Sequence, residues 1–107
     1  TSSKEASELL GATRADLVVY GHVHAASSGM VDGVRLRSVG SVGFPWDGDP
    51  RAAYGVATWT GERWRVEDRR VSYDHEAVAE ELASRLPGGE VCARSIRDAS
   101  FRPFLEQ

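Results

Sequence analysis

The chain has 107 residues, 41% of them hydrophobic, and a formal net charge of -3 at pH 7. This length and composition suit one small domain with its own core and exclude a disordered segment. The arginines are scattered among carboxylates and form no basic stripe, so we expect no strong affinity for nucleic acid.

The first part of the chain predicts a helix, a buried strand and a loop that carries two histidines. Apolar residues at helical spacing predict a short helix over residues 3–10, closed by Gly11. Four consecutive apolar or aromatic residues over Leu17–Tyr20 predict a central strand that is covered on both faces. His22 and His24 follow directly at the carboxyl end of that strand.

A short hairpin and two loops come next. Residues 30–34 contain an Asp-Gly turn and lead into a predicted strand over residues 34–39, after a small, polar stretch. Residues 40–43 interrupt this strand with two glycines, which fits either a tight bend or an anion site that offers backbone N–H groups and a hydroxyl. Residues 44–51 form a turn-rich loop with two large aromatic residues, so this loop either folds back on the core or lines a pocket.

The clearest hairpin joins predicted strands over residues 53–59 and 64–71. Apolar and charged residues alternate along the second strand, which predicts one buried face and one exposed face. On this pattern we expect Tyr54, Trp59 and Trp64 to belong to the core.

The last third of the chain predicts one well-defined helix and a weaker tail. The helix covers residues 75–86, and Val78, Leu82 and Leu86 share its apolar side. The tail is weakly helical over residues 91–99 and irregular beyond them.

His22 and His24 are the residues with the clearest potential for chemistry. In an extended segment, residues i and i+2 point to the same side, so the two rings can converge on one ion or on two neighbouring ions. Neutral imidazole suits Zn, Fe, Mn or Ni, and ligands collect at the carboxyl ends of buried strands. The alternative is that both are polar residues at a strand end that hydrogen-bond to the backbone.

Three further residues are candidates for contact with a phosphate. Gly40 and Ser41 could present N–H and hydroxyl groups to the anion, with the tight bend as the alternative. Arg51 could bind a substrate phosphate or remain a solvated loop arginine. Asp47 and Asp49 fit turn chemistry better than a cation site.

The order of these segments resembles the C-terminal part of calcineurin-like metallophosphoesterases, in particular their small bacterial and archaeal phosphodiesterases. In that family the last metal motif, Gly-His-x-His, precedes an Asn-Pro-Gly-Ser-x-Gly-like loop. The matching segments lie between about residues 13 and 86: Ala15-Asp16-Leu17-Val18-Val19-Tyr20-Gly21-His22-Val23-His24, Gly40-Ser41-Val42-Gly43, Tyr54-Gly55-Val56-Ala57 and Arg70-Val71-Ser72-Tyr73-Asp74. The resemblance implies an α+β or α/β fold: the C-terminal part of a four-layer αββα sandwich of two mixed sheets with flanking helices.

The resemblance also implies a dinuclear metal centre. His22 and His24 would each ligate one of two divalent ions, with Mn, Fe, Ni and Zn all open, and a metal-activated water would hydrolyse a phosphate ester. Ser38 and Val39 replace the family's Asn and Pro, which puts a side-chain role of that asparagine in doubt. The family's other metal motifs have no counterpart in these residues.

Each ion needs about four to six ligands, so two histidines do not complete the centre. We therefore expect residues 1–107 to be a single domain or the C-terminal segment of a larger metallophosphoesterase domain. An N-terminal segment of the same enzyme would supply the remaining ligands; that the sequence does not begin with methionine fits this expectation. A homo-oligomer is also open, and the alternative function is a non-catalytic metal- or protein-binding module of the same fold.

Cysteine content and hydropathy bear on localisation. Cys92 is the single cysteine, which excludes an internal disulfide and predicts a reducing compartment, the cytoplasm. No apolar run approaches the roughly 20 residues needed to cross a bilayer, and the polar start is not a signal peptide.

Overall fold

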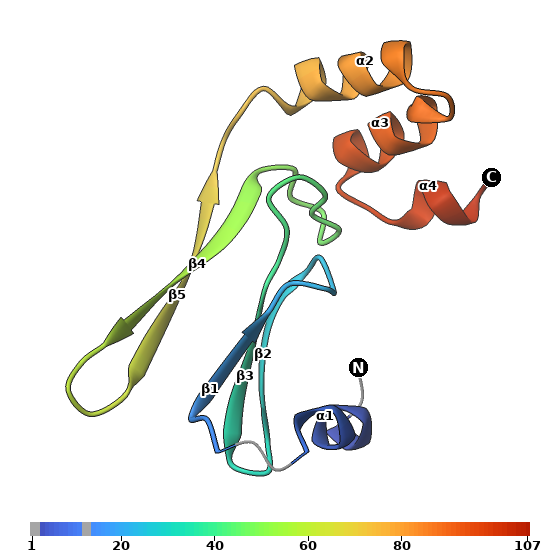
Figure 1. The fold of residues 1–107 in the computed structure, drawn as a ribbon. Helices are drawn as coiled ribbons and strands as arrows, with labels where there is room; N and C mark the ends of the chain where they lie inside the picture. The colour runs from blue at the N-terminus through green and yellow to red at the C-terminus, as the bar shows by residue number, and fades with distance from the viewer. Residues whose placement is uncertain (1–2, 12–13) are drawn as a thin grey trace.

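The computed structural model describes residues 3–11 and 14–107, and its elements form a mixed α+β arrangement (Figure 1). In chain order they are α1 (Ser3–Leu10), β1 (Leu17–Tyr20), β2 (Ala26–Val31), β3 (Val34–Val39), β4 (Ala52–Trp59), β5 (Trp64–Val71), α2 (His75–Arg85), α3 (Gly89–Asp98) and α4 (Arg102–Leu105). The strands form one sheet of three and one of two.

The three-stranded sheet has the order β1-β3-β2. β1 runs parallel to β3, and β2 runs antiparallel to it. The prediction that residues 17–20 form a central strand covered on both faces is therefore wrong within the described residues, because β3 takes the central position. Val19 on β1 is 48% exposed.

The turn between β2 and β3 explains why β2 is longer than expected. Asp32 (φ 51°) and Gly33 (φ 77°) are both left-handed, as in the type I′ turn whose twist matches a two-residue hairpin. The antiparallel ladder then extends back to Ala26, opposite Val39. Pairing with β3 thus makes a strand of small, polar residues that have little strand propensity of their own.

Every second residue of β3 faces the β4–β5 hairpin. Arg35 donates a hydrogen bond from Nη1 to the carbonyl of Trp64 (2.6 Å), and Arg37 forms an ion pair with Asp68 (2.7 Å). The intervening residue, Leu36, faces the opposite side and lines a cavity beside α1. Because side chains alternate along a strand, Arg35 and Arg37 lie on the same face of β3, and their contacts join the two sheets.

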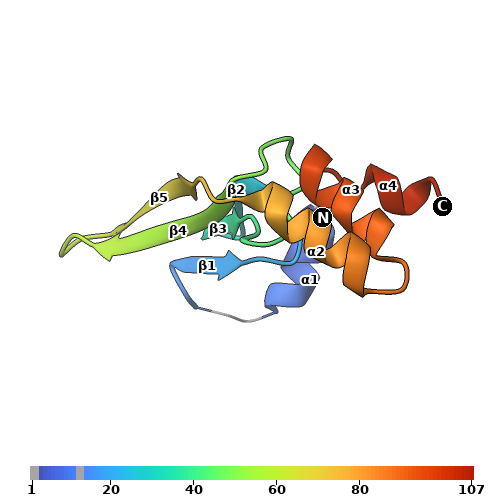
Figure 2. The ribbon, with the colours of Figure 1, turned by 90° about the horizontal axis from the view of Figure 1, so that it is seen from above.

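The predicted β4–β5 hairpin is confirmed, but its aromatic residues are not core. The ladder pairs Ala52 with Val71 and ends at Trp59 and Trp64, which are 50% and 37% exposed; Tyr54 is 38% exposed. The hairpin extends away from the helices (Figures 1 and 2), so the two tryptophan rings, 5.5 Å apart, pack on each other and not under a further layer.

The helix predicted over residues 75–86 is confirmed as α2, which ends at Arg85. The carboxylate of Asp74 accepts a hydrogen bond from the N–H of Ala77 (3.0 Å) and caps its first turn. The predicted apolar side is right only in part: Leu82 packs against the buried core, whereas Val78 and Leu86 are exposed. Ala79, which was not predicted, is fully buried.

The weakly helical tail is a full helix, α3, followed by the short helix α4 in place of an irregular end. α3 packs against α2, and Ala79, Ala93 and Ile96 form the buried core between them. Sequence pattern alone did not find this core because its members are mostly alanines, which favour helix on a buried or an exposed side alike and so do not mark the buried one.

The molecule is more extended than a compact domain of its length. Its radius of gyration is 16.4 Å, against about 13 Å for 107 residues packed compactly. Its accessible surface is 7061 Å², against about 5,800 Å² for a compact monomer of its mass. The chain therefore exposes a surface that a compact fold would cover.

Candidate metal centre

Two loops meet at one edge of the three-stranded sheet. β1 and β3 are parallel neighbours, with Tyr20 opposite Ser38, so their carboxyl ends lie at the same edge. The loop with His22 and His24 leaves β1 there, and the loop that begins at Gly40 leaves β3. This is the position at which α/β sheets collect ligands.

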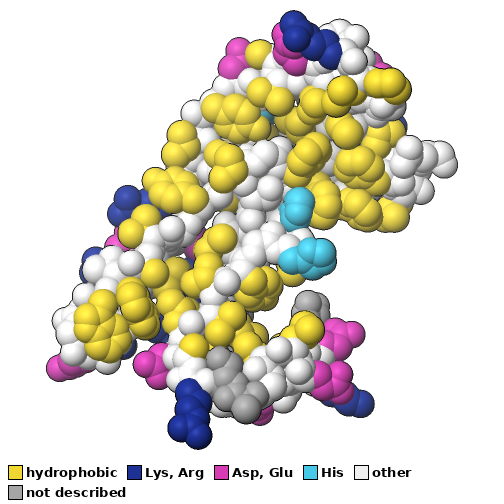
Figure 3. Space-filling model, in the orientation of Figure 1, with side chains coloured by type: hydrophobic (Ala, Val, Ile, Leu, Met, Phe, Trp, Pro, Cys, Tyr) yellow, Lys and Arg dark blue, Asp and Glu magenta, His cyan; other side chains and the backbone are white. Residues whose placement is uncertain are grey.

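The two histidines occupy a turn and not an extended segment. Residues 22 and 23 form the turn, and His24 adopts a left-handed φ of 63°. The argument that an extended backbone brings the rings to one side is therefore wrong, although Figure 3 shows histidine side chains together on the face between α1 and the C-terminal helices.

The ring of His24 is held on its Nδ1 edge and on one face. Nδ1 lies 2.9 Å from the carbonyl oxygen of Phe44, and because a carbonyl only accepts, Nδ1 carries the proton. The ring stacks on Trp46 with centroids 3.9 Å apart and planes at 17°. In the neutral ring Nε2 then carries the lone pair that a metal ligand requires, and a backbone carbonyl on Nδ1 is a common partner of metal-ligating histidines.

His22 is placed differently. Its side chain is exposed and lines one part of the cavity beside α1. No ring contact or hydrogen bond to the His22 ring is recorded among the described residues, so the structure leaves both of its nitrogens open.

Ser38 holds the histidine turn and was not identified as a candidate from the sequence. It is fully buried, and its hydroxyl donates a hydrogen bond to the carbonyl of Ala25 (2.6 Å), the residue after His24. The signal available in the sequence was a small hydroxyl residue near the end of the predicted strand, two residues before Gly40.

Gly40 and Ser41 form a tight bend. Gly40 has φ 82°, and a Cβ placed on it would lie 2.9 Å from the Cβ of Ala53. The hydroxyl oxygen of Ser41 accepts a hydrogen bond from the N–H of Phe44 (2.9 Å). These contacts favour the structural alternative, and a role of Gly40 and Ser41 in substrate binding stays a prediction.

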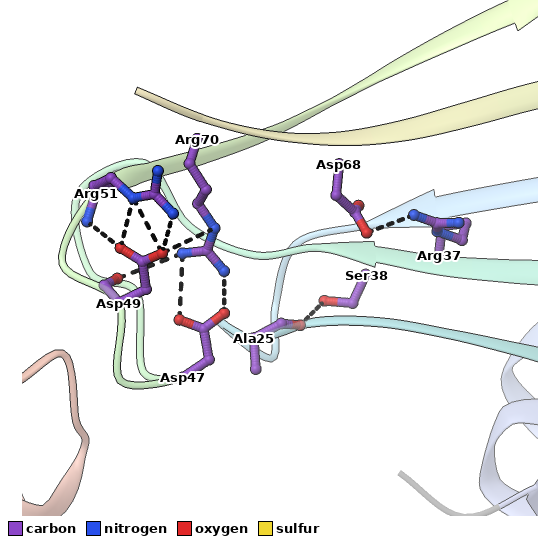
Figure 4. Close-up of polar contacts among 8 residues, drawn as sticks. All are labelled: Ala25, Arg37, Ser38, Asp47, Asp49, Arg51, Asp68 and Arg70. Carbon is purple, nitrogen blue, oxygen red and sulfur yellow. Dashed lines mark hydrogen bonds and ion pairs between the residues drawn. The ribbon is translucent and has the colours of Figure 1, made fainter. Parts of the chain in front are cut away.

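Arg51 belongs to a network of ion pairs that fixes the loop after Trp46 (Figure 4). Its Nη2 lies 2.7 Å from the carboxylate of Asp49, while Arg70 on β5 binds the carboxylate of Asp47 and the carbonyl of Asp49 (3.4 Å). The guanidinium of Arg51 therefore has an acidic partner, and its contact with a substrate phosphate stays a prediction.

We expect the Asp49 carboxyl to titrate near pH 2. Hydrogen bonds from Arg51 lower its pKa to about 2, so the contribution of this pair to stability is fully present above the ordinary value near 4 and is lost as the pH falls toward 2. In the Arg51→Gln variant the pKa should rise toward about 3.9, measured by carboxyl ¹³C NMR. Arg85→Gln, which breaks only a pair with Glu81 on α2, serves as the control; an unchanged pKa in Arg51→Gln would contradict the assignment.

The described part of the chain does not complete a metal site. Within residues 3–11 and 14–107, no three His, Cys, Asp or Glu side chains come together in a group that could hold an ion. None of the described helices combines the length and hydropathy that crossing a bilayer requires.

Comparison with known proteins identifies the fold. No protein-family model and no curated protein matches the chain. The crystal structure of a metallophosphoesterase from Sphaerobacter thermophilus is similar to it, with a TM-score of 0.72 and 24% sequence identity over 91% of this chain and 47% of that chain. The chain thus shares the fold of a metallophosphoesterase and spans about half the length of that protein.

Proposed function

We propose that this chain contributes His22 and His24 to a centre of two divalent metal ions that hydrolyses a phosphate ester. The observation that carries the proposal is the ring of His24: Phe44 accepts its Nδ1–H at 2.9 Å, which leaves Nε2 free at the carboxyl edge of the sheet. The fold shared with a metallophosphoesterase supports the same assignment.

The residues of this chain would bind and orient the reacting groups. When bound, two divalent ions supply Lewis acidity toward the phosphate ester and activate water for the attack on phosphorus. His24 would ligate through Nε2, held in orientation by Phe44 and Trp46. Mn, Fe, Ni and Zn all suit imidazole nitrogen, so the donor atoms of this chain do not select one of them.

We also propose that an N-terminal segment of the same enzyme completes the centre and the four-layer sandwich. An apolar cavity of about 630 Å³ lies between α1 and the three-stranded sheet, lined by Leu9, Leu10, Val18, Met30 and Leu36 among others. The accessible surface of this chain exceeds that of a compact monomer of its mass. The excess is of the same order as the area that one partner buries in a standard protein–protein interface, about 800 Å². Strand β1, whose residues Val18 and Tyr20 also line this cavity, is an edge strand among the described residues, and an unpaired strand edge favours association.

The decisive experiment measures hydrolysis of a chromogenic bis-aryl phosphate with added Mn²⁺. We expect no turnover by residues 1–107 alone and metal-dependent turnover once the N-terminal segment is present. If neither preparation is active and metal analysis of both finds no bound ion, the catalytic proposal is wrong. Substrate class then follows from comparing phosphomonoesters, phosphodiesters and nucleotides on the active form.

The second candidate is a non-catalytic metal- or protein-binding module of the same fold. It is favoured by the observation that no three potential ligands meet in the described residues. A preparation that binds the N-terminal segment stoichiometrically but stays inactive with each of the four metals would support it. A homo-oligomer formed through the same exposed surface would be detected by light scattering. Cytoplasmic localisation, supported by the free thiol of Cys92, remains part of the main proposal.

A further inference from the structure

Trp46 connects the candidate ligand His24 to the C-terminal helices. One side of its indole stacks on the His24 ring at 3.9 Å, and the ring of Phe101 lies 4.7 Å away at 50°. The indole Nε1–H donates a hydrogen bond to the hydroxyl of Ser95 on α3 (3.1 Å). The backbone N–H of Trp46 also donates to the carbonyl of His24 (2.8 Å).

Ser95 is a fully buried hydroxyl in a core that is otherwise apolar. Its Oγ accepts from Trp46 and donates to the carbonyl of Ser100 (2.7 Å), so both roles of the hydroxyl are filled. Burying an unpartnered hydroxyl costs about 1–3 kcal/mol, so these contacts explain why a serine is tolerated there. A second hydrogen bond, from the N–H of Gly48 to the carbonyl of Ala99 (3.0 Å), fixes the loop that carries Trp46 to the end of α3.

The backbone of His24 needs such support. Its φ of 63° is left-handed, a conformation that costs a residue with a Cβ roughly 1–2 kcal/mol. A strained residue of this kind persists only where its surroundings hold it. Among the described residues, Phe44 and Trp46 are the ones whose contacts act on the ring and carbonyl of His24.

We infer that Trp46 and Ser95 are positioning residues for His24. Helix α3 fixes the indole through Ser95, and the indole fixes the imidazole, so that Nδ1–H stays on the carbonyl of Phe44 and the neutral ring presents the lone pair of Nε2. The role of His24 as a ligand rests on the proposed function; its orientation by Trp46 and Ser95 does not.

The test is ¹⁵N NMR of the imidazole rings in the metal-free chain, at a pH where the histidines are neutral. In the unmodified protein we expect His24 to be mainly the Nδ1–H tautomer, while the exposed His22 shows the mixture of a free imidazole, in which Nε2–H predominates. In the Trp46→Leu variant the ¹⁵N shifts of the His24 ring should move to those of His22, which report the tautomer mixture of a free imidazole. Trp46→Phe, which keeps an aromatic ring but loses the indole N–H, and Ser95→Ala should give a smaller shift in the same direction.

Matched controls separate positioning from general destabilisation. Trp64→Phe changes an indole at the end of the β4–β5 hairpin, and Ser84→Ala removes a hydroxyl that bonds only the carbonyl of Glu81 on α2 (3.2 Å). Both should leave the His24 tautomer unchanged. If His24 keeps the Nδ1–H tautomer in Trp46→Leu, Trp46→Phe and Ser95→Ala, with amide spectra showing an intact fold, the inference is wrong.

A Mn²⁺ titration of the chain joined to its N-terminal segment distinguishes this inference from the proposed function. Loss of a residue that only orients a ligand should weaken binding about 10–100-fold, and we expect this for Trp46→Leu. A tautomer shift without any Mn²⁺ binding in the unmodified protein would refute the metal centre and leave the positioning role standing. If the unmodified protein binds Mn²⁺ and all three variants bind it equally while keeping the Nδ1–H tautomer, the positioning role alone is refuted.

Discussion

Replacing His24 by asparagine is expected to lower the turnover of a bis-aryl phosphate by the complete enzyme by more than about 100-fold. Losing a residue that only orients a ligand costs about 10–100-fold, and the loss of the ligand itself should exceed that range. Asparagine is preferred to alanine because it tolerates the left-handed conformation that His24 adopts, at φ 63°. Bound metal, measured on the same preparation, should fall together with the rate.

His75 supplies the matched histidine control for this experiment. It begins α2, and its recorded ring contact is with Tyr73 at a centroid distance of 6.1 Å. His75→Asn should retain both full activity and full metal content. If His24→Asn also retained both, the ligand assignment would be wrong; if it lost activity but kept its metal, His24 would act on the substrate and not on an ion.

Replacing Gly89 by alanine is expected to destabilise the α2–α3 pair by about 3 kcal/mol, the upper end of the usual cost of overpacking a core. A Cβ on Gly89 would lie 1.8 Å from the carbonyl oxygen of Leu82, so the two helices would have to separate. The measurement is the urea unfolding midpoint. Because Ser95 lies on the same helix, the His24 tautomer should shift as well.

Gly29→Ala is the control for the Gly89 substitution. Gly29 lies on β2, and an added Cβ there meets no atom within 4 Å. We expect a change within about 0.5 kcal/mol, as for other exposed positions. An unchanged midpoint for Gly89→Ala would contradict the close packing of α2 on α3.

The predictions that succeeded were those carried by short-range chemistry. The Asp-Gly turn of the first hairpin, the strands of the second hairpin and the helix after Asp74 each follow from a few neighbouring residues. The placement of His22 and His24 at the carboxyl end of a strand over Leu17–Tyr20 also came from local pattern, although this strand lies beside β3 and not at the centre of the sheet.

The predictions that failed depended on which surfaces meet. Burial of Trp59, Trp64 and Val78 was expected from periodicity, yet these side chains are exposed because no described layer covers them. Periodicity indicates which side of an element is apolar. It does not indicate whether anything in the chain packs against that side.

Motif and spacing are local properties, and they predict the residues of the candidate centre: the two histidines after β1 and the glycine loop after β3. That these loops leave the sheet at the same end, and that Trp46 contacts both Ser95 and the ring of His24, follows from the tertiary structure alone. Ser95 and Trp46 are 49 residues apart, and their contact depends on how α3 docks against the loop after β3. There Trp46 packs on Phe101 and Phe104, and no local pattern in the sequence specifies that these rings meet.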